Sequence, residues 1–85
     1  KVKNPSGLHV RPATYIVRLL QNFQSKVTLT YKGESINARS IMSIMILAAP
    51  KNAKIVVDIE GIDASQVLEK LVEAFDTQFG EGVSR

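Results

Sequence analysis

The single histidine of the chain, His9, stands directly before a segment that can begin a helix, in the stretch "SGLHVRPAT". Pro12 has no backbone N–H to donate, so it suits the first turn of a helix, where that group would lack a helical partner. Such a turn attracts anions, and the Arg11 guanidinium can bind two phosphoryl oxygens at once. Neutral imidazole has a lone pair that can attack phosphorus without a separate base. These residues predict that His9 accepts a phosphoryl group beside Arg11.

Other roles for a lone histidine have less support. Taken without its neighbours, His9 would be interpreted as an exposed loop residue. A metal site would need more ligands, but the chain has no Cys and no second His, and no carboxylate lies near His9 in sequence. A serine nucleophile paired with His9 also has little support, since Ser6 lies in a predicted turn with no acidic residue to orient the imidazole. We therefore expect no metal and no cofactor.

The composition is that of one small globular domain. The 85 residues are 45% hydrophobic and 22% charged, which is ordinary for a globular chain. No apolar run approaches the ~18 residues that a membrane span requires, so we expect no membrane insertion. Without Cys and without a signal-peptide pattern, the expected location is the cytoplasm. The net charge of +3 comes from scattered Lys and Arg residues and gives only a mild preference for acidic partners.

Hydrophobic periodicity and turn residues predict alternating strands and helices. The expected strands are 1–3, 26–31, a returning strand after the turn "YKGE", and 54–60, and the expected helices are about 10–22, 41–49 and a last one ended by Gly80. The last helix has Asp63 and Gln66 at capping-box spacing and an apolar stripe of Val67, Leu68, Leu71, Val72 and Phe75. The order βαββαβα predicts a two-layer α+β fold, in which helices cover one face of a mainly antiparallel sheet.

The segment 41–49 has more apolar residues than one buried face requires. The residues expected in the core are Ile44, Leu47 and Ala48, and those expected to face outward are Ile41, Met42 and Met45. Surplus apolar side chains, with flexible methionines among them, favour a docking surface that can meet several proteins. A helix buried on two sides would explain the same pattern, but the predicted phosphoryl site nearby favours docking.

The segments "GLHVRPAT" and "RSIMSIMILA" together resemble the histidine-containing phosphocarrier family, HPr, of the bacterial phosphoenolpyruvate-dependent sugar phosphotransferase system. The first is similar to the family's active-site motif, and the second to its regulatory serine followed by an apolar docking helix. The separation between His9 and Ser40 also matches, and the resemblance covers essentially the whole chain. The sequence departs from the family at Val10 and Ser43, which bear on partner affinity and not on phosphoryl chemistry.

The resemblance implies a fold and a function. The fold would be an open-faced β-sandwich over residues 1–85, with four antiparallel strands covered by three helices. The protein would be a monomeric carrier and not an enzyme in its own right. Enzyme I would phosphorylate His9 on Nδ1 with Arg11 stabilising the phosphoryl group, and sugar-specific IIA domains would receive it. The partner-binding residues expected are Val10, Pro12, Thr14, Ile41, Met42 and Met45.

Ser40 is expected to be the N-cap residue of the second helix, since serine accepts a hydrogen bond from a backbone N–H two or three residues on. By resemblance it is also a regulatory phosphorylation site. A phosphate there would be tolerated by the helix N-terminus but would lie beside Ile41 and Met42, where enzyme I would dock. The "SIM" that follows the serine is similar to family members modified by an HPr kinase/phosphorylase, which makes that kinase an expected partner.

Two other functions fit the same outline. A ferredoxin-like RNA-binding module has a similar element order, but the predicted strands lack exposed aromatic residues that stack on bases, and Tyr31 is predicted to face the core. We therefore expect no nucleic-acid partner. A purely regulatory relative of the family would bind proteins without carrying phosphate, and the presence of His9 argues against it. Phosphorylation by phosphoenolpyruvate and enzyme I separates a carrier from both.

Overall fold

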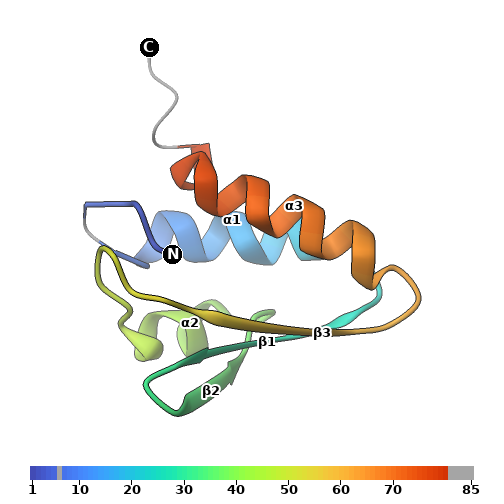
Figure 1. Cartoon of the computed structure of the whole chain (residues 1–85), viewed down its shortest axis with the longest axis horizontal. Coiled ribbons are helices and arrows are strands. Elements are labelled where there is room, and N and C mark those ends of the chain that lie inside the picture. Colours follow the sequence, from blue (N-terminus) through green and yellow to red (C-terminus); the bar gives the residue numbers. More distant parts are fainter. Residues whose placement is uncertain (6, 81–85) are drawn as a thin grey trace.

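A computed structural model describes residues 1–5 and 7–80, and Ser6 and residues 81–85 lie outside it. The elements in chain order are α1 (Val10–Leu20), β1 (Lys26–Tyr31), β2 (Glu34–Asn37), α2 (Ile41–Leu47), β3 (Val56–Glu60), α3 (Ala64–Asp76) and the 3-10 turn η1 (Gln78–Gly80). Figure 1 shows α1 and α3 side by side above the sheet, and α2 packs against α1 and β2. The expected open-faced sandwich, with three helices and an antiparallel sheet, is confirmed.

The sheet has the order β2-β1-β3, with both pairs antiparallel. The hairpin predicted at "YKGE" joins β1 to β2 through Lys32 and Gly33, whose φ angles of 50° and 81° are those of a two-residue turn matched to the twist of the strands. On β1, Val27 and Leu29 alternate into the core, as the sequence pattern predicts. Tyr31 packs against the same core, so β1 presents no stacking surface there.

Residues 1–3, expected to be a strand, do not form one. Val2 is fully buried and exchanges two backbone hydrogen bonds with the loop before β3. Its N–H donates to the Ala53 carbonyl at 2.9 Å, and its carbonyl accepts from the Asn52 N–H at 2.7 Å. One exchanged pair anchors the segment but is too short for a strand ladder. Within the described residues the sheet therefore has three strands and not the expected four.

Helices α1 and α2 end earlier than expected. Helix α1 begins at Val10, as Pro12 predicts, and ends at Leu20. Helix α2 ends at Leu47, because Ala48 adopts a left-handed conformation with φ of 53° and its N–H bonds the Met45 carbonyl. Ala48 is exposed in this position, so the expectation that it belongs to the core is wrong. The chain has already left the helix when it reaches Pro50.

Helix α3 differs from expectation at its end and in its stripe. It ends at Asp76, well before Gly80, and Gln78 and Phe79 then adopt positive φ angles that turn the buried Phe79 ring back towards the core. Only part of the predicted stripe is buried, namely Val67, Leu71 and Phe75. Leu68 and Val72 are half exposed, because α3 meets the rest of the molecule along a narrower face than the sequence pattern suggests.

The predicted capping box at the start of α3 is also wrong. The Asp63 side chain makes no capping hydrogen bond to α3. Its carboxylate accepts from the Gln24 N–H at 2.8 Å, from the Ser25 N–H at 2.9 Å and from the Ser25 hydroxyl. These bonds lower the pKa of Asp63 below its ordinary value, chiefly through the Ser25 side chain and then the Gln24 N–H. Asp63 therefore joins the start of α3 to the start of β1.

The core lies between the helices and the sheet and draws on each helix and on β1. Its largest fully buried apolar side chains are Ile16, Leu20, Leu29, Ile44 and Leu71. Each contributes roughly 1.5–3 kcal/mol through removal of apolar surface from water. Among the described residues, none of the helices combines the length and the apolarity that crossing a bilayer requires.

Candidate functional site

His9 is the N-cap residue of α1, as the sequence predicts. Its backbone is extended, with φ of −114° and ψ of −161°, and its carbonyl accepts the first helical hydrogen bond from the Ala13 N–H at 2.9 Å. The side chain makes no capping bond to its own helix and is half-buried, whereas an exposed side chain was expected. Pro12 packs in the first turn and is fully buried. His9 thus stands at the end of α1 from which backbone N–H groups point outward.

The electrostatic environment at this end of α1 is positive. The first turn contains no acidic residue and does contain Arg11, which is exposed. The partial positive charge of the helix N-terminus adds to that of the guanidinium. An anionic group held by His9 would therefore meet favourable charge from the helix and from Arg11 together.

The loop before His9 is hydrogen-bonded to the segment that follows α2. The Leu8 N–H donates to the Ala49 carbonyl at 2.9 Å, and Leu8 itself is buried. Gly7 has a φ of 69°, and a Cβ atom there would collide with the Ala49 carbonyl oxygen and the Pro50 Cα. Glycine is needed at position 7 for both its conformation and this close approach. The loop therefore places His9 next to the end of α2.

Ser40 is the N-cap residue of α2, as predicted. Its Oγ accepts from the Ser43 N–H at 3.2 Å, and its carbonyl accepts from the Ile44 N–H at 3.1 Å. The Ser40 side chain is half-buried. The Ser40 hydroxyl thus caps α2, the helix whose outward face was expected to bind partners.

The outward face of α2 is apolar and exposed. We call Ile41, Met42, Met45 and Ile46 the α2 patch; Met42 is 73% exposed and Ile46 is 66% exposed. The alternative of a helix buried on two sides is therefore wrong. Ile46 was not among the predicted outward residues, although its position four residues after Met42 puts the two on one helical face.

The other expected partner-binding residues lie on α1. Val10 is exposed beside His9, and Thr14 is half-buried. Pro12 must be removed from the expected binding surface, because its ring is covered within the first turn of α1. Tyr15, which was not predicted, is partly exposed and makes an edge contact with the Phe79 ring at a centroid distance of 6.0 Å.

Arg39 has a structural role that sequence analysis did not detect. Its guanidinium donates to three backbone carbonyls, those of Leu20 at 2.7 Å, Phe23 at 2.9 Å and Ser25 at 2.8 Å. The cation thus supplies hydrogen-bond donors to backbone carbonyl groups at the C-terminal end of α1 and in the loop that follows it. Because Arg39 directly precedes Ser40, it fixes the start of α2 against the end of α1. Backbone acceptors 14 to 19 residues away carry no local sequence signal.

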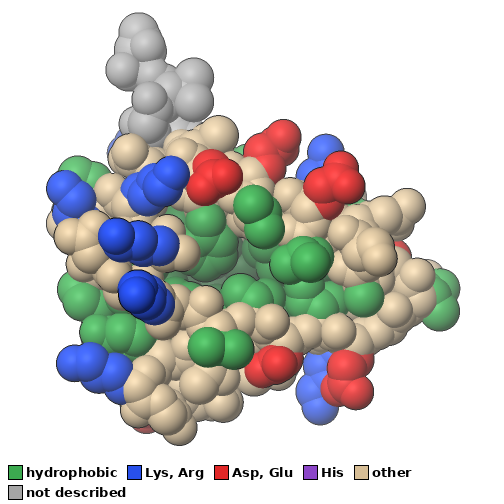
Figure 2. Space-filling model, viewed as in Figure 1, with side chains coloured by type: hydrophobic (Ala, Val, Ile, Leu, Met, Phe, Trp, Pro, Cys, Tyr) green, Lys and Arg blue, Asp and Glu red, His purple; other side chains and the backbone are tan. Residues whose placement is uncertain are grey.

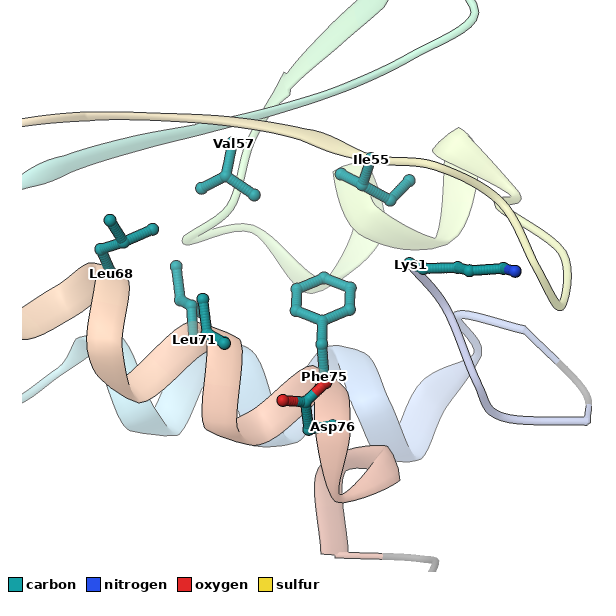
Figure 3. A pocket seen from close by; sticks show the side chains of 8 residues that line it. Lys1, Ile55, Val57, Leu68, Leu71, Phe75 and Asp76 are labelled. Atoms are coloured by element: carbon teal, nitrogen blue, oxygen red, sulfur yellow. The ribbon is translucent and has the colours of Figure 1, made fainter.

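A hollow of about 180 Å³ lies between α3 and β3 (Figure 3). It is lined by Lys1, Ile55, Val57, Leu68, Leu71, Val72, Phe75 and Asp76. Figure 2 shows this face, where apolar side chains gather in the centre and Lys and Arg side chains at one end. No predicted site residue lines the hollow. In the part of the chain that the structure describes, no group of three or more His, Asp or Glu side chains could hold a metal ion.

Comparisons with known proteins agree on one family. The family described as "PTS HPr component phosphorylation site" matches residues 1–77. Phosphocarrier protein HPr of Chlamydia muridarum is 50% identical over 80 residues, which cover 94% of this chain and 77% of that protein. The crystal structure of HPr-C-His from Thermoanaerobacter tengcongensis has a TM-score of 0.90 at 32% identity, covering 98% of this chain and 93% of that chain. HPr from Bacillus anthracis has a TM-score of 0.83 at 35% identity, covering 88% and 89%.

Proposed function

Because the chain belongs to the PTS HPr family and is a phosphocarrier of that system rather than an enzyme, we propose that His9 carries the phosphoryl group on Nδ1, from enzyme I to sugar-specific IIA domains. The observation that supports this most directly is the position of His9 as the N-cap residue of α1, with Arg11 exposed in the first turn. A nucleophile, a helix N-terminus and a guanidinium thus lie within one helical turn.

Transfer requires little covalent chemistry from the protein. The Nδ1 lone pair forms a bond to phosphorus while the bond between phosphorus and the donor breaks, and no proton has to leave the nucleophile first. Negative charge on the peripheral phosphoryl oxygens is stabilised by Arg11 and by the N–H groups at the start of α1. The same groups hold the phosphoryl on His9 until a IIA nucleophile takes it.

Enzyme I and the IIA domains would dock on the surface around His9. The α2 patch, with Val10 and Thr14 of α1, supplies apolar contact area beside the reacting nitrogen. The Leu8 bond to Ala49 holds the His9 loop and α2 together, so one partner surface can reach both. Binding energy from the α2 patch would then serve to orient the two phosphoryl-bearing groups.

The test is phosphorylation by enzyme I and phosphoenolpyruvate, followed by intact mass measurement before and after acid treatment. We expect one added phosphate that acid removes, and we expect His9→Ala to remain folded and unmodified. Acid distinguishes the products because a phosphohistidine is labile and a phosphoserine is not. An alanine variant that still takes an acid-labile phosphate would show that His9 is not the acceptor. A wild-type protein that binds enzyme I but takes no phosphate would favour the purely regulatory alternative.

We further propose that Ser40 is a regulatory site modified by an HPr kinase/phosphorylase. A phosphate on Ser40 would add nearly two negative charges next to the apolar α2 patch, which a docking partner would have to desolvate. Ser40→Asp should accept phosphate from enzyme I more slowly than Ser40→Ala, with little change in thermal stability. Equal rates in the two variants, or kinase modification of Ser35 or Ser43 in place of Ser40, would contradict this role.

The setting proposed for this carrier is a monomer in the cytoplasm. A carrier that meets two partners in turn needs its α2 patch uncovered between encounters, and self-association through that patch would compete with docking. Sedimentation should give a single species of about 9.3 kDa, and a dimer that buries the patch would contradict this. Membership of the HPr family argues against the alternative function as a ferredoxin-like RNA-binding module.

A further inference from the structure

Asn4 is a polar residue with no exposed surface, located five residues before His9. Its side-chain Nδ2 donates to the Gln78 carbonyl at 2.9 Å, across 74 positions of sequence. Its own carbonyl accepts from the Gly7 N–H at 3.0 Å, which closes the turn that leads to His9. One residue thus forms the turn before His9 and attaches it to the 3-10 turn η1.

The acceptor of the Asn4 bond lies in an unusual backbone segment. Gln78 and Phe79 have φ angles of 56° and 54°, a region that costs residues other than glycine roughly 1 kcal/mol or more. The turn is retained because it buries Phe79 between Phe75, at a ring distance of 4.8 Å, and Tyr15. Asn4 donates a hydrogen bond to a carbonyl of this strained turn. This bond and the ring contacts together hold η1 against α1.

The contacts of Asn4 converge on the helix that begins at His9. From Asn4 the chain passes through the Gly7 turn to Leu8, which is bonded to Ala49. Across its side-chain bond it reaches η1 and then, through Phe79, the second turn of α1 at Tyr15. The exposed ion pair of Lys3 with Asp76, at 3.4 Å, joins the same two segments but contributes little in water.

We propose that Asn4 is a positioning residue for phosphoryl transfer, whose buried amide fixes the loop before His9 to the turn η1, which follows α3. This inference rests on the proposed role of His9. The Asn4 donor is costly to replace, because Asn4 is fully buried and its loss would deprive the Gln78 carbonyl of a hydrogen-bond partner. Loss of the bond would let the loop move. A displacement of the nucleophile by about 1 Å can slow a reaction about a hundredfold.

The test compares Asn4→Asp and Asn4→Ala with wild type in steady-state phosphorylation by enzyme I at varied carrier concentration. Neither variant can donate to the Gln78 carbonyl. We expect kcat to fall by about tenfold or more while KM for the carrier stays within about twofold, because the α2 patch is unchanged. The ¹⁵N chemical shifts of the His9 imidazole, measured at one fixed pH, should also differ from those of wild type in both variants.

Ser25→Ala is the matched control for a loss of stability alone. Ser25 is also buried and also makes a long-range side-chain bond, to Asp63 at the opposite end of α3. The length of α3 separates the two sites by about 20 Å. We expect kcat for Ser25→Ala to stay near the wild-type value at a temperature where all variants are folded.

Phe79→Leu weakens the ring contacts that hold the same turn. It tests the positioning role if the Asn4 variants do not fold. It should lower kcat in the manner expected for Asn4→Ala. Folded variants with wild-type kcat, or an equal loss in Ser25→Ala, would overturn the positioning role while wild type still accepts phosphate. A wild type that takes no acid-labile phosphate on His9 would instead defeat the proposed function, and the positioning role with it.

Discussion

Arg11 and Arg18 lie on the same helix but meet opposite electrostatic environments. Arg18 is in the last turn of α1, where the helix dipole favours a cation. Arg11 is in the first turn, where the dipole disfavours a cation by a few tenths of a kcal/mol to about 1 kcal/mol. The helix dipole therefore does not explain why a cation stands two residues after His9, whereas binding of an anion would.

Substitution of the two arginines by glutamate should separate these effects. Arg11→Glu should slow phosphorylation by enzyme I at least about tenfold, because it sets a negative charge against the incoming phosphoryl group. Its unfolding free energy should change by less than about 1 kcal/mol. Rates and urea unfolding measured side by side give both quantities.

Arg18→Glu is the control for a general effect of charge. It changes the net charge by the same amount as Arg11→Glu but lies at the other end of α1, so phosphorylation should remain near the wild-type rate. An equal slowing in the two variants would mean that the carrier responds to its total charge, and Arg11 would lose its special role.

At the scale of elements, α2 divides its apolar residues between two tasks. Ile44 and Leu47 are buried against α1 and the sheet, whereas the α2 patch faces water. A helix of seven residues is too short to be stable alone, so packing of Ile44 and Leu47, the Ser40 cap and Arg39 hold it in place. The patch can therefore be changed without unfolding the helix.

Met45→Glu should weaken binding of enzyme I by about 2 kcal/mol, or roughly thirtyfold in Kd, because a charge would enter an apolar contact without a partner. Thermal unfolding should change little, since Met45 is exposed. Titration calorimetry against enzyme I measures the loss.

The matched control for Met45→Glu is Ile62→Glu, which introduces the same charge at an apolar residue that is 90% exposed in the loop between β3 and α3. We expect this variant to bind enzyme I like wild type. Undiminished binding by a folded Met45→Glu would mean that the α2 patch is not the docking surface.

At the scale of the whole molecule, α3 is attached to the rest of the fold at both ends. Asp63 holds its start to Ser25, and Asn4 holds the turn after its end. Between them, Val67, Leu71 and Phe75 pack into the core. The helix layer is therefore fastened by one charged anchor and one neutral anchor, and only the charged anchor responds to pH.

Asp63 should make the fold sensitive to acid. Its hydrogen bonds lower its pKa below 3.8 in the folded state, so the unfolded chain takes up this proton at a higher pH than the folded chain does. The stability that Asp63 supplies is thus complete above about pH 5 and is lost as the pH falls through its lowered pKa. Urea unfolding from pH 7 down to pH 2.5 should show wild type and Asp63→Asn converging at the acid end.

Asp58→Asn tests whether removal of any carboxylate has the same effect. Asp58 is exposed on β3, and we expect its variant to follow the wild-type stability curve at each pH. A constant difference between wild type and Asp63→Asn over the whole range would show that the Asp63 bonds do not depend on its charge.

Features that depend on a few consecutive residues were predictable from the sequence. Pro12 marks the start of α1 and thereby the place of His9, "YKGE" marks the hairpin, and Ser40 marks the start of α2. Each follows from local rules, such as a missing N–H, a turn that needs positive φ, or a hydroxyl within reach of a nearby N–H. The motifs around His9 and Ser40 also sufficed to indicate the family.

Features that depend on a distant partner were not predictable. Asp63 was expected to cap α3 and instead bonds Ser25, the guanidinium of Arg39 reaches back to α1, and Asn4 bonds Gln78. A hydrogen-bonding side chain shows in the sequence that it needs a partner, but the choice between a neighbour and a residue 38 or 74 positions away depends on how the layers pack. Packing likewise settled that the Pro12 ring is buried and that Ala48 is exposed, because helix periodicity predicts that a face is apolar but not how much of it the neighbouring elements cover.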